Sequence, residues 1–331
     1  MKMNSVFFLF GVVHLVYSRT YHVDVMNKKH EICKQLSHFV PNLCDYPTAA
    51  QYCFGLCGGT RELLSCGKRP PLGRRVRRIV GGVKSRPGEW PWQVSLRLNG
   101  TQWCAGAILS EHFVLSAAHC FDAGYSSINP ADWRVHAGDH ELLAKDKLEQ
   151  EVRVRKIILH PKYNYSVHKT TQKYWGVLHN DVAILQLKTA IKLKHSNKAA
   201  ICLPDNQKII PDLYGCYAVG WGHTSYNGTQ PDELRHAKVY TVPNSICNSE
   251  VAYNNTVNPK ELICAGYKDG GIDACNYDSG GALVCNKKDR WYATGIVSSG
   301  FECARPHSYG LYTNVAEYKE WIIENILLKA E

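Results

Sequence analysis

Cysteines are the feature that most constrains the fold of this chain. Fourteen of them are spread over 331 residues. An even number of cysteines along a chain indicates paired disulfides and an oxidising compartment. Apolar residues make up 45% of the chain and charged residues 21%, which is an ordinary globular balance. The sequence therefore predicts a disulfide-linked folded core and excludes a disordered or repetitive chain.

The N-terminus is typical of a secretory signal. Residues 6–17 are almost wholly apolar, and this run falls short of the about 20 residues that a membrane-spanning helix needs. We expect a signal peptide over residues 1–18, with cleavage after Ser18, and no membrane span further along. The sequence therefore predicts a secreted, extracellular protein. The expected glycosylation sites are the four Asn-x-Ser/Thr sequons at Asn99, Asn164, Asn227 and Asn254.

The formal net charge of +10 is concentrated near the N-terminus. Residues 1–78 carry 12 Lys/Arg against 4 Asp/Glu, whereas residues 79–331 carry 27 against 25. The larger part of the chain is therefore close to neutral. Its balance gives no electrostatic reason to expect a nucleic-acid partner.

A basic linker divides the chain. The segment Arg74-Arg75-Val76-Arg77-Arg78 follows two prolines and a glycine, a composition that stays extended and open to proteolysis. The alternative is a solvated charge run or a polyanion-binding patch. We expect a cysteine-rich propeptide or light segment over residues 19–78 and the main domain over residues 79–331.

The light segment is poor in apolar residues. This favours a small module stapled by disulfides over one with a real core. The pairing of Cys33, Cys44, Cys53 and Cys57 cannot be deduced from the sequence. These cysteines faintly resemble those of anemone-toxin-like modules, and an unclassified propeptide is the alternative.

Short β-type runs broken by turns follow from Ile79 onward. Val152 and Val154 alternate with Arg153 and Arg155, which is the period of a strand with one wet face. Many strands and one helix, over residues 316–328, favour an antiparallel barrel or sandwich. The expected strands cover residues 92–98, 113–116, 133–137, 152–159, 182–187, 217–221, 237–242, 282–285, 291–297 and 311–315.

Three separated residues carry the candidate chemistry. A serine nucleophile needs a base to take its proton and a carboxylate to orient that base. His119 lies in Ser-Ala-Ala-His-Cys, Asp181 opens Asp-Val-Ala-Ile-Leu, and Ser279 lies in Asp-Ser-Gly-Gly. Together with the Ile-Val-Gly-Gly sequence that begins at Ile79, they make residues 79–331 resemble the trypsin-like (chymotrypsin-fold) serine peptidases.

The resemblance implies a fold and a reaction. The expected fold is all-β, with two six-stranded antiparallel Greek-key β-barrels, a C-terminal helix and a small disulfide-rich N-terminal segment. The expected activity is that of a serine endopeptidase, in which Ser279 attacks, His119 is the base and Asp181 orients it. The backbone amides of Tyr277 and Ser279 would form the oxyanion hole.

Specificity and activation follow from the same resemblance. Asp273 would lie at the floor of the primary pocket, with Gly300 and Gly310 as its small wall residues, so substrates would carry Arg or Lys before the cut. Ala274 removes a hydroxyl partner for lysine, which favours arginine.

Activation would follow cleavage after Arg78 by a furin-like convertase or another trypsin-like protease. The freed amino group of Ile79 would then pair with Asp278. Protein protease inhibitors are further expected partners.

The resemblance also implies disulfide pairs. They are Cys104–Cys120, Cys216–Cys285, Cys247–Cys264 and Cys275–Cys303, and Cys202 is left for Cys66 if the other four cysteines of the light segment pair among themselves. We expect no zinc site, because every cysteine of the main domain then has a disulfide role. No cofactor is required. Asp139, Glu141 and Glu149 lie where some trypsins hold structural calcium, and solvated acids are the alternative.

Tyr277 and Ser299 are two of the positions that depart from the family pattern. Tyr277 replaces a glycine, so its amide either rotates out of the oxyanion hole or stays while the phenol enters the leaving-group side of the cleft. Ser299 replaces a tryptophan. Between residues 161 and 181, Tyr163, Tyr165, Tyr174 and Trp175 either rebuild the upstream subsites or belong to a solvated loop. The alternative function is a catalytically impaired homologue that acts as a binding cofactor or decoy.

Overall fold

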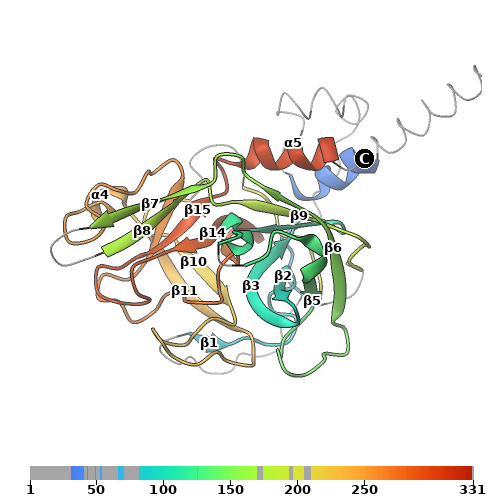
Figure 1. Ribbon diagram of the computed structural model, residues 1–331, viewed down its shortest axis with the longest axis horizontal. Helices are drawn as coiled ribbons and strands as arrows, with labels where there is room; N and C mark the ends of the chain where they lie inside the picture. Colours follow the sequence, from blue (N-terminus) through green and yellow to red (C-terminus); the bar gives the residue numbers. More distant parts are fainter. Residues whose placement is uncertain are drawn as a thin grey trace, which may run out of the picture.

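Two closed six-stranded antiparallel barrels lie side by side and form most of the molecule (Figure 1). This computed structural model describes residues 31–40, 43, 49, 53, 66–70, 82–124, 126–169, 174–193, 197–204 and 210–329. The all-β fold with a C-terminal helix is confirmed. The predicted signal peptide, Arg78, Ile79, Cys44 and Cys57 lie outside the described residues.

The first barrel closes through the strand order β2-β3-β4-β9-β6-β5. Its interior is filled by apolar side chains such as Val94, Leu96, Val114 and Leu185, all 0% exposed. The strands are β2 (Gln93–Leu98), β3 (Thr101–Ile108), β4 (Phe113–Ser116), β5 (Trp133–Ala137), β6 (Gln150–Leu159) and β9 (Ala183–Leu187).

The second barrel repeats this topology. In both barrels the first three strands form a meander, and the last strand then pairs with the third. A short strand, β1 (Val83–Lys84), adds to the edge of β11. The barrel strands are β10 (Gly215–Gly220), β11 (Arg235–Val242), β12 (Leu262–Gly266), β13 (Ala282–Lys287), β14 (Arg290–Ser299) and β15 (Gly310–Asn314).

The segment before Asp181 forms a β-hairpin. The sequence analysis left open whether this segment is a solvated loop or part of the upstream subsites. Strands β7 (Asn164–Lys169) and β8 (Tyr174–His179) pair antiparallel. Alternate residues of a strand face opposite sides. One side of the hairpin buries Trp175 and Val177 in the apolar cluster that also contains Tyr253 and Leu311 of the second barrel. The other side leaves Tyr165 exposed.

Helices are few and short. The C-terminal helix α5 (Lys319–Lys329) begins three residues later than expected, and it buries Ile322 and Ile326. The remaining helical turns are α4 (Asn244–Cys247) and the 3₁₀ turns η2 (Ala118–Phe121) and η3 (Pro130–Asp132). Residues 31–39 form a further helix that the sequence analysis missed.

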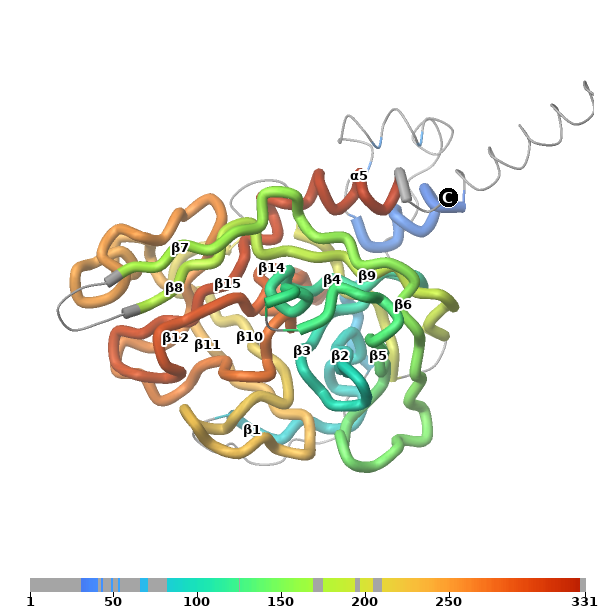
Figure 2. The backbone as a smooth tube through the Cα atoms, in the orientation of Figure 1, coloured from blue at the N-terminus to red at the C-terminus, as the bar shows by residue number. Residues whose placement is uncertain are grey.

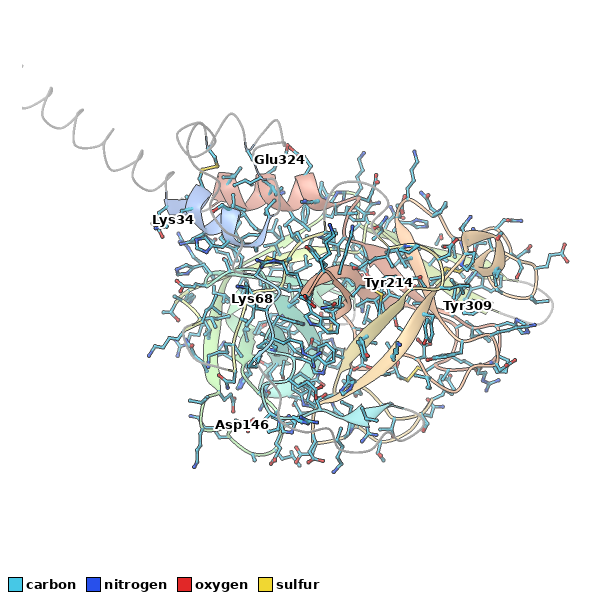
Figure 3. All side chains as sticks on the ribbon, turned by 180° about the vertical axis from the view of Figure 1, so that it is seen from behind. Lys34, Lys68, Asp146, Tyr214, Tyr309 and Glu324 are labelled. Atoms are coloured by element: carbon cyan, nitrogen blue, oxygen red, sulfur yellow. A yellow bond between two sulfur atoms is a disulfide. The ribbon has the colours of Figure 1, made fainter. Side chains whose placement is uncertain are left out.

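This N-terminal helix shares the core of the larger domain. It lies beside α5, and the two helices carry Lys34 and Glu324, labelled in Figure 3. Leu36 and Phe39 belong to the same buried cluster as Ile323 of α5. The apolar residues of this helix therefore pack onto the main domain.

Residues 66–70 fasten the light segment to the main domain. The disulfide Cys66–Cys202 joins them covalently. The Gly67 amide donates to the Ala200 carbonyl oxygen at 2.8 Å. The guanidinium carbon of Arg69 lies 4.0 Å from the ring centroid of Trp90. Such a cation–π contact adds about 1–2 kcal/mol when it is partly desolvated. A chain cut between these residues and β1 would stay in one piece.

The buried ring of Phe39 gives a stability prediction. Phe39 is 1% exposed, and replacing a buried phenylalanine with alanine removes apolar contacts and leaves a cavity. Phe39→Ala should lower the free energy of unfolding by about 3–5 kcal/mol in chemical denaturation. Lys34→Ala, on the exposed side of the same helix, is the control. Equal stability of the two variants would contradict the shared core.

Candidate active site

A buried carboxylate lies where the two barrels meet. Asp181, just before β9, is 0% exposed. Its Oδ1 accepts the His119 backbone N–H at 2.8 Å, and its Oδ2 accepts the His119 Nδ1–H at 2.7 Å. Ser298 of β14 donates its Oγ hydrogen to the same Oδ2 at 2.6 Å. Both oxygens are therefore satisfied, and the second barrel supplies one of the donors.

The charges of the pair favour each other. Burial alone would lower the pKa of His119, but the charge and hydrogen bond of Asp181 outweigh it, so the pKa lies above the ordinary value. Burial alone would raise the pKa of Asp181, but His119 and Ser298 outweigh it and hold the pKa below its usual range. The arrangement stabilises an imidazolium next to a permanent carboxylate.

His119 and Ser279 line one cavity of about 470 Å³. His119 comes from the turn η2 after β4, and Ser279 from the loop before β13. The cavity also touches Trp103 and Cys104 of β3. The structure thus brings together the three residues that the sequence singled out, across nearly half of the chain.

Tyr277 keeps the backbone conformation of the glycine that it replaces. Its φ is +74°, in the left-handed region, where a non-glycine residue costs about 1–2 kcal/mol. Two hydrogen bonds hold it there. The His223 N–H donates to the Asn276 carbonyl oxygen at 3.0 Å, and Gln102 Nε2 donates to the Tyr277 carbonyl oxygen at 3.0 Å.

These bonds fix the direction of the Tyr277 amide. In a trans peptide the N–H points opposite to the preceding carbonyl, so the Tyr277 N–H points away from His223. Among the described residues, the amides of Tyr277 and Ser279 donate to no acceptor. The amides of Asp278, Gly280 and Gly281 around them are all used. Two neighbouring donors are therefore left free beside Ser279.

The phenol of Tyr277 lies on the wall of the cavity. Its ring centroid is 5.1 Å from that of His223, and both side chains line the space next to His119. The side chain therefore narrows this part of the cleft.

Asp273 lies in a second cavity, of about 440 Å³, that opens beside Ser279. Burial raises the pKa of Asp273 to about 7. Its carboxylate accepts only backbone N–H groups, from Ala274 at 2.8 Å and from Ala304 at 3.4 Å. Among the described residues no cation pairs with it, so the cavity ends in an unpaired acid.

The two glycines of this cavity differ in their surroundings. A β-carbon at Gly310 would lie 2.6 Å from Asp273 Oδ1, whereas one at Gly300 would meet nothing closer than 3.9 Å. Gly310 is therefore the residue that leaves Asp273 accessible.

Asp278 is held in a third, small cavity of about 50 Å³. Its carboxylate accepts the Gly222 N–H at 2.7 Å and the Cys275 N–H at 3.0 Å. A β-carbon would fall 2.0 Å from this carboxylate at Gly220 and 2.2 Å at Gly222, so glycine is required at both positions. Burial raises the pKa of Asp278 to about 6.

Comparisons with known proteins agree with this geometry. The family model described as trypsin matches residues 79–322. This chain belongs to the trypsin family of serine proteases. It is similar to transmembrane protease serine 11C of Mus musculus, with 37% identity over 258 residues, and to transmembrane protease serine 5 of Homo sapiens, with 38% identity over 260 residues.

The matches cover 78% of this chain and 55% and 52% of the two relatives. The chain therefore spans about half the length of the curated relatives that it matches. Within the part of the chain that the structure describes, no helix is long and apolar enough to cross a membrane.

The disulfides of the trypsin-family domain are those that the resemblance implies. The structure contains Cys104–Cys120, Cys216–Cys285, Cys247–Cys264 and Cys275–Cys303. In the light segment Cys33 pairs with Cys53, which the sequence left open.

Trp175 of the hairpin stands near the position where Ser299 replaces the family's tryptophan. Both residues line the cavity that contains Asp273. The Trp175 indole N–H donates to Thr256 Oγ1 at 3.1 Å, which fixes the ring against the second barrel. Tyr163 and Tyr165 instead line the cavity of His119. The side chain of Tyr174 lies outside the described part of the structure.

Two of the three acids considered for calcium have other side-chain partners. Asp139 accepts from Arg97 Nη2 at 2.9 Å, and Glu149 contacts His136 Nδ1. Glu141 forms a backbone β-bridge with Glu233, which does not involve its carboxylate. Calcium prefers six to eight oxygen ligands. A guanidinium and an imidazole in the cluster do not fit that ion.

Several contacts of the site left no signal in the sequence. Ser298 and Thr313, which donates to the Asp181 carbonyl oxygen at 2.8 Å, come from strands of the second barrel. His223 and Gln102 position the loop at Tyr277 through backbone atoms. The separations of Ser298 and Thr313 from Asp181 exceed 100 residues, so these contacts depend on the tertiary fold.

The Arg97–Asp139 pair gives a pH-dependent stability prediction. Burial raises the pKa of Asp139 to about 7. A raised carboxyl pKa stabilises the fold at low pH, and this contribution is lost as the pH rises from about 4 through 7. Arg97→Gln removes the cation and should cost about 3 kcal/mol at about pH 8, and clearly less at about pH 5. The measurement is denaturant unfolding at both pH values.

Arg134→Gln is the control, because its partner Glu151 is 55% exposed and the ion pair is 3.5 Å long. Its cost should stay within about 1 kcal/mol at either pH. An equal loss for Arg97→Gln at the two pH values would contradict the assignment to Asp139.

Proposed function

We propose that this chain is an extracellular serine endopeptidase made as a zymogen and activated by cleavage after Arg78. It cuts peptide bonds after arginine and, more slowly, after lysine. One observation carries the proposal: the His119–Asp181 hydrogen bond of 2.7 Å, with His119 and Ser279 on the wall of one cavity.

The proposed mechanism follows from the site. His119 takes the proton of Ser279 as the hydroxyl attacks the substrate carbonyl, and Asp181 stabilises the imidazolium that forms. The free amides of Tyr277 and Ser279 receive the negative charge on the carbonyl oxygen. His119 then returns its proton to the leaving amine, and a water molecule releases the acyl group from Ser279.

Specificity is assigned to Asp273. A buried, unpaired carboxylate at the end of a cavity favours a cationic side chain that reaches it. Ala274 offers no side-chain hydroxyl to a lysine ammonium, whereas an arginine guanidinium can donate twice to one carboxylate. Arginine is therefore the preferred residue before the cut.

Activation is assigned to Asp278. The carboxylate has backbone partners but, among the described residues, no cation. A new amino group at Ile79 would neutralise it and stabilise the loop that carries Tyr277 and Ser279. The basic run before Ile79 suits a furin-like convertase or another trypsin-like protease.

Secretion and glycosylation belong to the same proposal. The apolar run at residues 6–17 supports a signal peptide. The side chains of Asn99, Asn164, Asn227 and Asn254 are all exposed, which supports their modification.

Active-site titration tests the enzyme. A phosphonylating probe and an arginine-terminated peptide are applied to the full chain before and after cleavage at Arg78, with Ser279→Ala as the blank. Labelling and turnover should appear only after cleavage. A chain that starts cleanly at Ile79 and still shows neither would instead support the alternative of a binding cofactor or decoy.

Substitutions of the two pocket glycines test specificity. Gly310→Ala would place a methyl group against Asp273 and should lower kcat/KM for arginine peptides by about 100-fold or more, because a charged partner is blocked. Gly300→Ala, with more room, is the matched comparison and should lose less. The comparison is made with matched arginine and lysine peptides. Similar losses at both glycines would argue against this assignment.

Tyr277→Gly tests the oxyanion loop. If the amide already points correctly, the change should alter turnover of a short arginine peptide by less than about tenfold. If the tyrosine had displaced the amide, the glycine would raise turnover by about 10²–10³. The same variant should bind rigid protein inhibitors more tightly, because the phenol no longer narrows the cleft. Tyr277→Phe, which keeps the ring, is the control.

A further inference from the structure

We infer that the outer face of β6 binds a linear sulfated polysaccharide. The surface consists of Arg153, Arg155, Lys156, Lys188 and Lys192, and we call it the β6 basic face. None of these residues lines the cavities that contain His119 or Asp273. The inference therefore goes beyond the proposed function and rests on it only for the extracellular location.

The strand register lines up cations in a row. Arg97 of β2 is paired with Arg134 of β5, and Arg134 with Arg153 of β6. Directly paired residues point to the same face of a sheet, and like charges in such pairs destabilise it. Arg97 and Arg134 are compensated by Asp139 and Glu151. Arg153 has no such partner among the residues that the structure describes.

A β-bulge adds to the row. The register of β6 against β9 shifts between Val154 and Lys156. A bulge places an extra residue on one strand and redirects its side chains. As a result the successive residues Arg155 and Lys156 are both exposed, although neighbours in a regular strand face opposite sides.

The chain after β9 completes the surface. The Lys188 N–H donates to the Arg153 carbonyl oxygen at 2.9 Å, and the Lys192 N–H donates to Gln150 Oε1 at 2.9 Å. This segment therefore follows β6 along its length. All five side chains of the β6 basic face are exposed. Figures 1 and 2 show β6 at the outer edge of the first barrel.

Acidic side chains in the described part of the chain do not neutralise the positive charge of this surface. The ion pairs of the described residues include none of its five cations. Glu151 is the acid on the same strand, and it lies 3.5 Å from Arg134. Residues 79–331 are thus close to neutral as a whole but have a local excess of positive charge on the β6 basic face.

The chemistry of the surface favours a sulfated polysaccharide. An exposed row of cations with no aromatic residue among them offers no platform for stacking bases, which argues against single-stranded nucleic acid. It also lacks the apolar side chains that anchor a protein partner or enter a membrane. The disulfides place the domain in an oxidising compartment, where sulfated polysaccharides of the cell surface are the abundant linear polyanions.

Affinity for a heparin-derived oligosaccharide tests the proposal. The full chain is compared with the triple variant Arg153→Gln, Arg155→Gln, Lys188→Gln. Lys260→Gln, Lys268→Gln, Lys288→Gln is the matched control, since it removes the same charge from exposed positions of the second barrel. The basic linker is common to all three proteins. The first variant should bind about tenfold more weakly or worse at physiological ionic strength, and the control less than about threefold.

Each outcome bears on the proposal. A tenfold loss confined to the first variant, together with a weaker dependence of affinity on salt, supports it. Equal losses in both variants would show that net charge or the linker carries binding, and would overturn it. Tighter binding of the full chain to polyglutamate or to anionic vesicles than to the oligosaccharide would also overturn it. Unchanged unfolding curves verify that both variants are folded.

Discussion

The buried charge of Asp181 is the constraint on which the rest of the structure depends. An isolated carboxylate without exposed surface is too costly to keep ionised, so every partner must be in place at once. The first barrel supplies His119, and the second supplies the hydroxyl of Ser298 to the carboxylate, while the hydroxyl of Thr313 holds the backbone carbonyl oxygen of Asp181. Neither barrel alone satisfies the charge. The interface between them is therefore specified by polar contacts as well as by apolar packing.

The loop that carries Ser279 shows how strain is tolerated at a working site. Tyr277 lies in a conformation that disfavours a side chain, yet both flanking carbonyl oxygens accept hydrogen bonds from outside the loop. Asp278, packed against Gly220 and Gly222, anchors the next position. The cost of one residue is offset by the contacts of its neighbours, which is the general condition for strained residues to persist.

Most strands and the catalytic candidates could be predicted from the sequence, because short motifs and the alternation of apolar residues depend on neighbouring residues only. Each expected strand overlaps an observed one, and the catalytic candidates were found beside strand ends. Strand β3 was missed, because its small residues, such as Ala105, Gly106 and Ala107, show little of the period of a strand. The partners of Asp181 were missed because only tertiary folding brings them near.

The net charge of a long segment also conceals where its charged side chains lie on the surface. The balanced charge of residues 79–331 gave no reason to expect a nucleic-acid partner, whereas the register of β5, β6 and β9 gathers cations on one face. The register between strands depends on residues far apart in the sequence, so it cannot be deduced from the amino-acid composition. Similarly, the segment before Asp181 looked like a loop, because its strand β7 places Ser166 and His168 on the side that packs inward.

The hairpin β7–β8 has a consequence for how the molecule unfolds. It is an extension of the first barrel, yet it buries Trp175 and Val177 in the apolar cluster of the second. His179 adds a hydrogen bond of 3.0 Å to Glu261, which lies just before β12. Separating the two barrels would expose this apolar cluster to water. Separation of the barrels is therefore coupled to their unfolding. The two barrels therefore behave as one cooperative unit, and a hinge motion between them is suppressed.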